Sequence, residues 1–240
     1  MGSEMCIRDS RPLRVLLVGD STALSLGPLL DAWGGPDHVW TVAKAAISGC
    51  GIVRGADVLN AYFPQPYDHC AKWTTEWPAL IEQTKPDLVV VSTGFWDGTD
   101  RRFSGEGDWE APDRPDYQAA IRADYTLAVE TLTRSGAALA WLDHPQVWFN
   151  EESPWPLGNP QIYDPWRMQV LDRIQHEVAD GRPNVQVVDT EQFFTTWPGG
   201  VLDPTLRPDG LHVKGDGAAP YINWLGPEIV HAYWAARGQG

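Results

Sequence analysis

Five short apolar runs divide the chain, and each is almost continuously hydrophobic rather than alternating with polar residues. They occupy residues 15–18, 39–43, 88–92, 138–142 and 185–188. Continuous apolar runs of this length, bounded by turn residues, are typical of strands that are buried on both faces. The pattern therefore predicts a five-stranded sheet that is covered on both sides.

Amphipathic segments alternate with these runs. Apolar residues recur at helical spacing over residues 23–33, 71–83, 117–134, 165–179 and 218–236. Strands that alternate with helices along a chain form mainly parallel sheets, because each helix carries the chain back to the start of the next strand. We therefore predict a three-layer α/β/α domain around a five-stranded, mainly parallel sheet.

Residues that can perform chemistry follow the predicted strands. In an open α/β sheet the ligand crevice lies outside the carboxyl ends of the strands. The glycines, acids, histidines and serine expected at this edge are Gly19, Asp20, Ser21, Gly49, Gly94, Asp97, Asp143, His144, Asp209 and His212. Two long connections, over residues 98–116 and 145–164, also begin at this edge, and long loops in compact domains are often functional.

The balance of charge excludes some classes of partner. The sequence has 18 Lys and Arg against 32 Asp and Glu, a formal net charge of −14. Such a chain offers no obvious basic patch for nucleic acid or for an anionic membrane surface. No apolar run approaches the roughly 20 residues of a membrane-spanning helix.

The first ten residues, MGSEMCIRDS, read like a leader derived from cloning or sequencing adaptors. We therefore expect residues 1–10 to be non-native and residues 11–240 to form a single domain. Within that domain the cysteines are Cys50 and Cys70. A disulfide and two unpaired thiols are both open at this point, and a disulfide would favour an extracytoplasmic location. No spacing of His and Cys resembles a zinc site.

Ser21 stands where the first strand passes into the first helix. Serine is a good residue for capping a helix, and it is also a nucleophile when a base lies beside it. Asp209 and His212 are three residues apart, so on one turn their side chains can face the same way. The acid can then orient the imidazole through one ring nitrogen while the second ring nitrogen faces a hydroxyl. His144 is the alternative base.

Four short blocks occur in order: GDS after the first strand, AISG after the second, TGFWD after the third and DGLH near the C-terminus. Together they resemble the SGNH (GDSL-like) hydrolase and acyltransferase superfamily, with its flavodoxin-like SGNH fold. The resemblance extends from about residue 14 to the end. It is closest to the SGNH domains fused to membrane acyltransferases of the acyltransferase-3 type.

The resemblance implies a role for each matching residue. Ser21 matches the nucleophile, His212 the base and Asp209 the residue that orients the base. The backbone N–H groups of Ser21 and Gly49 match the oxyanion hole. Substrate contacts are expected from the third block, at Gly94, Trp96 and Asp97. Asp20 matches an acid whose expected role is structural.

One position departs from the family pattern. The third block is usually Gly-x-Asn-Asp, and the Asn side chain gives a third oxyanion donor, but here Trp96 stands in its place. An indole has one N–H donor and a different reach from an amide. The departure affects the oxyanion hole more than the identity of the nucleophile.

The sequence thus predicts a serine esterase or O-acyltransferase that acts on acyl esters, with acetyl esters of carbohydrates as the expected substrates. It needs no metal or organic cofactor, and the domain is expected to be fused natively to a membrane acyltransferase. The alternative is a non-catalytic module that binds glycans or presents an acceptor. A flavodoxin-like nucleotide binder shares the sheet but leaves the Asp209 and His212 pair unexplained.

Overall fold

The computed structural model describes residues 12–34, 40–60, 63–66, 68–103, 107–148 and 163–238. Residues 1–10, the expected leader, lie outside the described residues, as does most of the long connection over 145–164. The central sheet has five parallel strands in the order β2-β1-β5-β7-β8. Its strands are β1 (Leu13–Gly19), β2 (Trp40–Ala46), β5 (Leu88–Ser92), β7 (Ala138–Leu142) and β8 (Val185–Val188).

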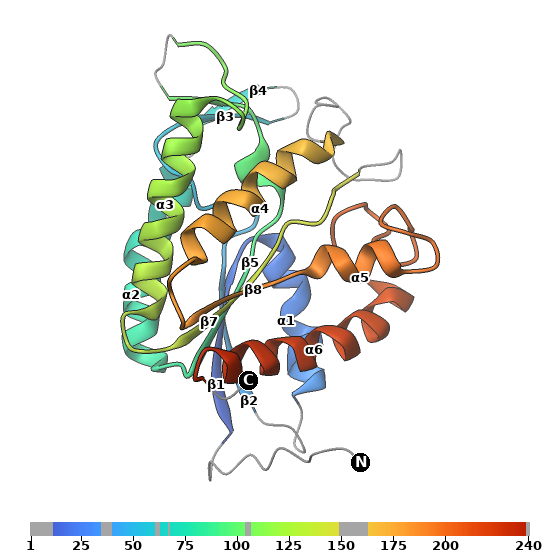
Figure 1. Cartoon of the computed structure of the whole chain (residues 1–240). Helices are drawn as coiled ribbons and strands as arrows, with labels where there is room; N and C mark the ends of the chain where they lie inside the picture. Colours follow the sequence, from blue (N-terminus) through green and yellow to red (C-terminus); the bar gives the residue numbers. More distant parts are fainter. Residues whose placement is uncertain are drawn as a thin grey trace.

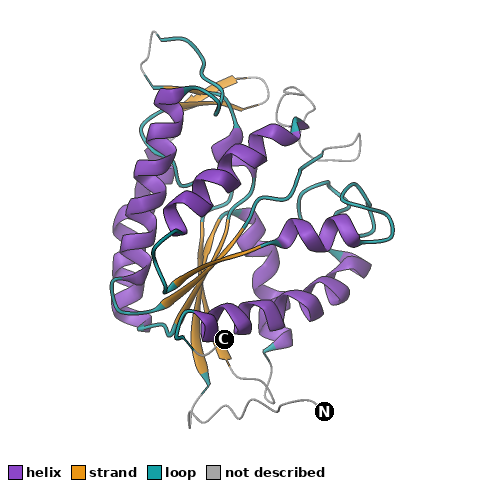
Figure 2. Ribbon diagram, viewed as in Figure 1, coloured by secondary structure: helices purple, strands orange, loops and turns teal. Residues whose placement is uncertain are grey.

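Helices cover both faces of this sheet (Figures 1 and 2). The longer helices are α1 (Ser21–Trp33), α2 (Trp73–Thr84), α3 (Pro115–Thr133), α4 (Pro165–Ala179) and α6 (Ala218–Ala235). One buried cluster packs α1 and α6 against one face, and a second packs α2, α3 and α4 against the other. The predicted three-layer architecture with a parallel sheet is confirmed.

The burial of the strands explains why their positions could be predicted from the sequence. All residues of β5 and β7 are buried. Their bounds, and those of β8 and α4, agree with the prediction. The prediction ended β2 at residue 43, whereas the strand continues to Ala46 and pairs with β1 as far as Gly19. Since Lys44 is exposed, the apolar run ends three residues before the strand does.

Shorter elements were not predicted. A separate antiparallel sheet, in the order β4-β3-β6, contains β3 (Asp57–Asn60), β4 (Phe63–Pro66) and β6 (Arg101–Arg102). Figure 1 shows β3 and β4 away from the central sheet, at the top of the view. The seven-residue helix α5 (Thr190–Thr196) begins directly after β8, where the Asp189 side chain accepts from the Gln192 N–H at 2.9 Å. Among the described residues, none of the helices combines the length and apolar character that crossing a membrane requires.

We expect the packing of α1 on α6 to be sensitive at Gly226. A Cβ at this position would lie 2.4 to 2.6 Å from three atoms of the rigid Trp33 ring rather than from the end of a flexible side chain. We expect Gly226→Ala to lower the free energy of unfolding by about 1–3 kcal/mol, measured by urea denaturation.

Gly27 provides a matched control, because it too precedes a proline inside a helix, Pro28 as against Pro227. A Cβ at Gly27 would meet only the flexible end of Lys44. Gly27→Ala should therefore cost much less than Gly226→Ala, and equal losses in the two variants would show that the indole contact is not the cause.

Candidate active site

Ser21 lies at the start of α1, and its position is set by the Asp20 carboxylate. Asp20 is fully buried. One of its oxygens accepts from the Thr22 N–H and from the Thr22 hydroxyl, both at 2.7 Å. The other accepts from the Gly94 N–H at 2.7 Å. Burial raises the pKa of Asp20, and these hydrogen bonds oppose the rise. Asp20 therefore joins the start of α1, where Ser21 lies, to the end of β5.

The residue before Asp20 must be glycine. Gly19 has φ +145, and a Cβ there would lie 1.7 Å from the Ser92 carbonyl oxygen. β1 and β5 thus approach each other closely at the point where the chain turns into α1. Ser21 itself is half-buried and is the first residue of α1.

Asp209 and His212 form a pair on a tight turn. The His212 Nδ1 lies 2.9 Å from one Asp209 oxygen, and the other oxygen accepts the His212 N–H at 2.8 Å. Burial raises the pKa of Asp209, but the hydrogen bonds from His212 and Lys214 outweigh it and hold the pKa well below its usual range. An ionised carboxylate can only accept, so Asp209 favours the form of the ring that carries its proton on Nδ1. The other ring nitrogen, Nε2, is then the acceptor.

The Nε2 atom of His212 is buried and has no hydrogen-bond partner among the described residues. The turn that carries His212 is tied to the first turns of α1. The Ser25 hydroxyl donates to the Val213 carbonyl at 3.3 Å. A Cβ at Gly94 would lie 3.3 Å from Thr22 and 3.4 Å from Leu211, so Gly94 contacts the neighbours of both Ser21 and His212. The structure thus places the turn that carries His212 beside the first turns of α1.

Lys214 was not among the residues that the sequence singled out. Its Nζ donates to the same Asp209 oxygen that faces the His212 ring, at 2.7 Å. Its position two residues after His212 gives no signal in the sequence, because its role depends on how the turn folds back.

His144, the alternative base, lies in a different environment. Its side chain is 1% exposed, and both ring nitrogens are engaged. Nδ1 lies 2.8 Å from Asp172 and Nε2 lies 3.0 Å from the Thr93 hydroxyl. Burial lowers the pKa of His144, but the Asp172 carboxylate outweighs it and the net shift is upward. This histidine joins β7 to α4, and its geometry favours a structural role.

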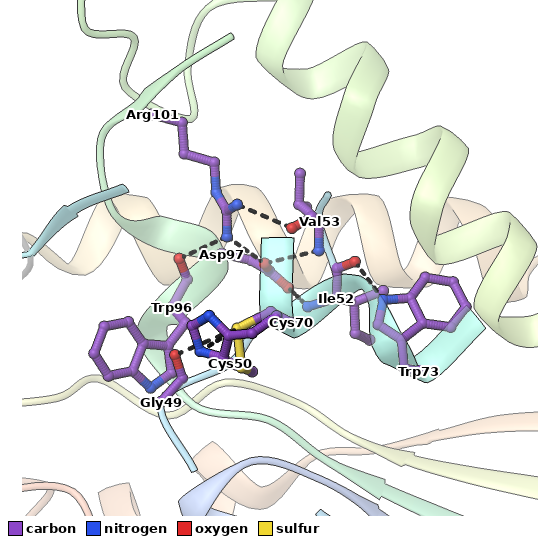
Figure 3. Close-up of a disulfide and its surroundings, with 10 residues drawn as sticks. Gly49, Cys50, Ile52, Val53, Cys70, Trp73, Trp96, Asp97 and Arg101 are labelled. Carbon is purple, nitrogen blue, oxygen red and sulfur yellow. Dashed lines mark hydrogen bonds and ion pairs between the residues drawn. A yellow bond between two sulfur atoms is a disulfide. The ribbon is translucent and has the colours of Figure 1, made fainter. Parts of the chain in front are cut away.

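Gly49 lies in the turn after β2 with φ +80, a conformation that favours glycine. A Cβ there would lie 3.7 Å from the ring of Trp96, which is 5% exposed and stacks on Phe95 with ring centroids 4.8 Å apart. Trp96 therefore packs beside the proposed oxyanion turn, with its ring toward Gly49 (Figure 3).

Asp97, expected to contact the substrate, is 1% exposed. Its carboxylate accepts the N–H groups of Ile52 at 2.8 Å and Val53 at 3.0 Å, and it pairs with Arg101 at 3.0 Å. Figure 3 shows these bonds meeting at the Asp97 carboxylate. The geometry favours a positioning role, in which Asp97 holds the chain that leaves the Gly49 turn.

The disulfide Cys50–Cys70 is present, with Cα atoms 5.3 Å apart. Like Asp97, it constrains the chain directly after Gly49. Cys50 directly follows Gly49, and Figure 3 shows the bond beside it. Among the described residues, Cys50, His69 and Cys70 form a group of the kind that can hold a metal. Because the two sulfurs are joined to each other, they are not available as thiolate ligands.

The comparisons with known proteins place this chain in a family. A model of the SGNH domain, described as fused to AT3 domains, matches residues 1–199. No curated protein sequence matches the chain.

Solved structures show the same fold at low sequence identity. A catalytic mutant of the acetylxylan esterase Axe2 from Geobacillus stearothermophilus is 16% identical, with a TM-score of 0.57 over 93% of this chain and 96% of that one. The periplasmic domain of a lipopolysaccharide acetyltransferase from Salmonella ser. Paratyphi A is 12% identical, with a TM-score of 0.55 over 92% and 85%. The aryl esterase of M. smegmatis is 15% identical, with a TM-score of 0.52 over 92% and 99%.

We expect the disulfide to stabilise the fold by closing a loop of 20 residues. Removing such a constraint typically costs about 3 kcal/mol. A variant with both Cys50→Ala and Cys70→Ala should unfold at lower urea concentration by that amount. Dithiothreitol should lower the stability of the wild type similarly and leave the variant unchanged; a wild type insensitive to reduction would contradict the expectation.

Asp143 should make stability depend on pH. Burial raises its pKa to about 7, although the Thr190 hydrogen bonds oppose the rise. Between about pH 4 and pH 7 the folded state holds a proton that the unfolded state has released, so this group lowers stability as pH rises through that window. Asp143→Asn should remove this contribution.

The measurement is urea unfolding of wild type and Asp143→Asn from pH 4 to pH 8. The stability of the variant relative to wild type should rise across the window and level off above it. Parallel curves would show that Asp143 ionises normally in the folded state.

The family match covers most of the chain, and the fold is that of the solved esterases. The chain therefore belongs to the family of SGNH domains fused to AT3 domains, as the sequence motifs predicted, and it is an enzyme of the SGNH ester hydrolase and acyltransferase type.

Proposed function

We propose that this domain is a serine esterase or O-acyltransferase in which Ser21 is the nucleophile, His212 the base and Asp209 the group that orients the base. The observation that carries the proposal is the hydrogen bonding of the two nitrogens of the His212 ring. Its Nδ1 is held by an ionised carboxylate, and its Nε2 is a buried acceptor without a partner among the described residues, beside the start of α1. A base in this state is ready to accept a hydroxyl proton.

The reaction proceeds through an acyl-enzyme. Ser21 Oγ attacks the ester carbonyl carbon, and its proton passes to His212 Nε2. The bond to the leaving alcohol then breaks, and His212 returns the proton to that alcohol. Water or a sugar hydroxyl attacks the acyl-enzyme in the same way and restores Ser21. Asp209 keeps the ring oriented and stabilises the imidazolium that forms.

The negative oxygen of each tetrahedral intermediate needs donors that are fixed in advance. The N–H groups of Ser21 and Gly49 are proposed for this role. Support for it comes from the way both are anchored: Asp20 fixes the start of α1, and Asp97 with the disulfide fixes the chain after Gly49. Trp96 provides the wall beside Gly49 in place of the usual amide.

Acetyl esters of carbohydrates are the proposed substrates. Two of the structures with the same fold are an acetylxylan esterase and a lipopolysaccharide acetyltransferase domain. Family membership supports a native fusion to a membrane acyltransferase, which would supply the acyl group to a sugar acceptor. The disulfide supports an extracytoplasmic location.

We expect Ser21→Ala to reduce turnover of a short aryl ester such as 4-nitrophenyl acetate by at least about 10³-fold, because no other group supplies the nucleophile. Far-UV circular dichroism and the melting temperature should stay close to wild type. Ser135→Ala is the control, since Ser135 is exposed in the turn before β7.

Mass spectrometry of acetylated xylo-oligosaccharides incubated with the protein separates hydrolysis from transfer. Glycan binding without any Ser21-dependent turnover would overturn the proposed mechanism and favour the non-catalytic module.

A further inference from the structure

A small cavity lies behind the Asp209 turn, on the α1 and α6 side of the sheet. Its volume is about 50 Å³. A cavity needs roughly 10–15 Å³ on this measure to hold one water, so there is room for about three or four non-hydrogen atoms. Its wall includes the ends of β5 and β7 and residues from α1, α5 and α6. Neither Ser21, Gly49 nor His212 lines it.

Arg207 lines this cavity and is 1% exposed. Its Nη2 donates to the carbonyls of Gln146 at 2.7 Å and Val201 at 2.6 Å. The guanidinium carbon lies 4.5 Å over the Phe194 ring. Nε and Nη1, which carry three of the five N–H donors, are buried and have no partner among the described residues.

The other buried arginines show what is unusual here. Arg101 pairs with Asp97 at 3.0 Å, and Arg167 pairs with Asp100 at 2.7 Å. Arg207 has no ion pair within 4 Å among the described residues. The carboxylates of Glu191 and Asp209 act on it only from a longer distance, so its burial is incompletely compensated. Burial lowers the pKa of Arg207 to about 10, so it still carries its charge at neutral pH.

The rest of the wall defines what would complement Arg207. Most of it is apolar, with Leu26, Leu29 and Phe194 among its side chains. Asp143 also lines the cavity, and its pKa of about 7 leaves it partly protonated at neutral pH. A protonated Asp143 can donate a hydrogen bond rather than repel an anion. The complement is therefore a molecule with one anionic end and a short apolar body.

We propose that this cavity is a binding site for a small monocarboxylate of the size of acetate. The carboxylate accepts from Nε and Nη1 of Arg207, and the methyl group lies against the apolar wall. The binding does not depend on Ser21 chemistry. If the proposed function holds, acetate is the product of hydrolysis of an acetyl-enzyme, so the site would hold product beside the turn that carries Asp209.

The test is titration of the full chain with sodium acetate at pH 7, followed by isothermal calorimetry and by NMR of 1-¹³C-acetate. We expect saturable binding at one site in the millimolar range or tighter. Sodium chloride at matched ionic strength, and inorganic phosphate, should not reproduce it. Saturable binding that chloride or phosphate reproduces equally would overturn the carboxylate assignment, and no saturable binding would overturn the site.

Arg207→Met should weaken acetate binding at least 10-fold, and Arg122→Met, on the exposed side of α3, should not. Leu29→Phe provides an independent variant, because it fills the cavity from α1 and keeps every Arg207 donor; it too should weaken binding at least 10-fold. Unchanged binding in Leu29→Phe would overturn the proposal even if Arg207→Met failed to fold. Ser21→Ala should bind acetate like wild type, which separates this site from the proposed catalysis.

Discussion

The arrangement of the site depends on one buried carboxylate. Asp20 is fully buried, and its two oxygens reach in different directions, one to the first turn of α1 and the other to the Gly94 N–H at the end of β5. Placing a carboxylate out of water is costly unless such donors compensate it. These hydrogen bonds offset part of that cost, and they lock the helix that presents Ser21 to the strand beside which the Asp209 turn packs. A helix cap alone would fix Ser21 to α1 only; the bond to Gly94 fixes it to the sheet.

The opposite side of the site is held by a second carboxylate of the same kind. Asp97 accepts two consecutive backbone N–H groups after the Gly49 turn and is neutralised by Arg101, which also donates to the Val53 carbonyl at 2.9 Å. The disulfide constrains the chain at Cys50, between Gly49 and the N–H groups that Asp97 accepts. Rigid anchoring matters for the proposed oxyanion donors, because such donors stabilise a transition state only when they need no rearrangement as the charge develops.

The sequence predicted those parts of the fold whose signal is local. Strands such as β5 and β7 are buried on both faces, so their apolar runs mark them from end to end. The β3, β4 and β6 strands are two to four residues long, and one of them reads FPQP, so composition gave no sign of them. The Asp209 and His212 pair was readable because it lies within a single turn. The long-range bonds of Asp20 and Asp97 were not, since each spans more than 40 residues.

Trp96 shows how one substitution from the family pattern changes the way a site is built. An asparagine at this place would add a polar donor to the proposed oxyanion hole, whereas the indole adds a large, rigid surface that packs against Gly49 and Phe95. The backbone of Trp96 is fixed independently, because its carbonyl accepts from the Thr99 hydroxyl at 2.7 Å and from Arg101 at 3.2 Å. The same arginine also holds Asp97. The wall and the anchor of the Gly49 turn therefore share one buried cation, so a change at Arg101 would disturb both together.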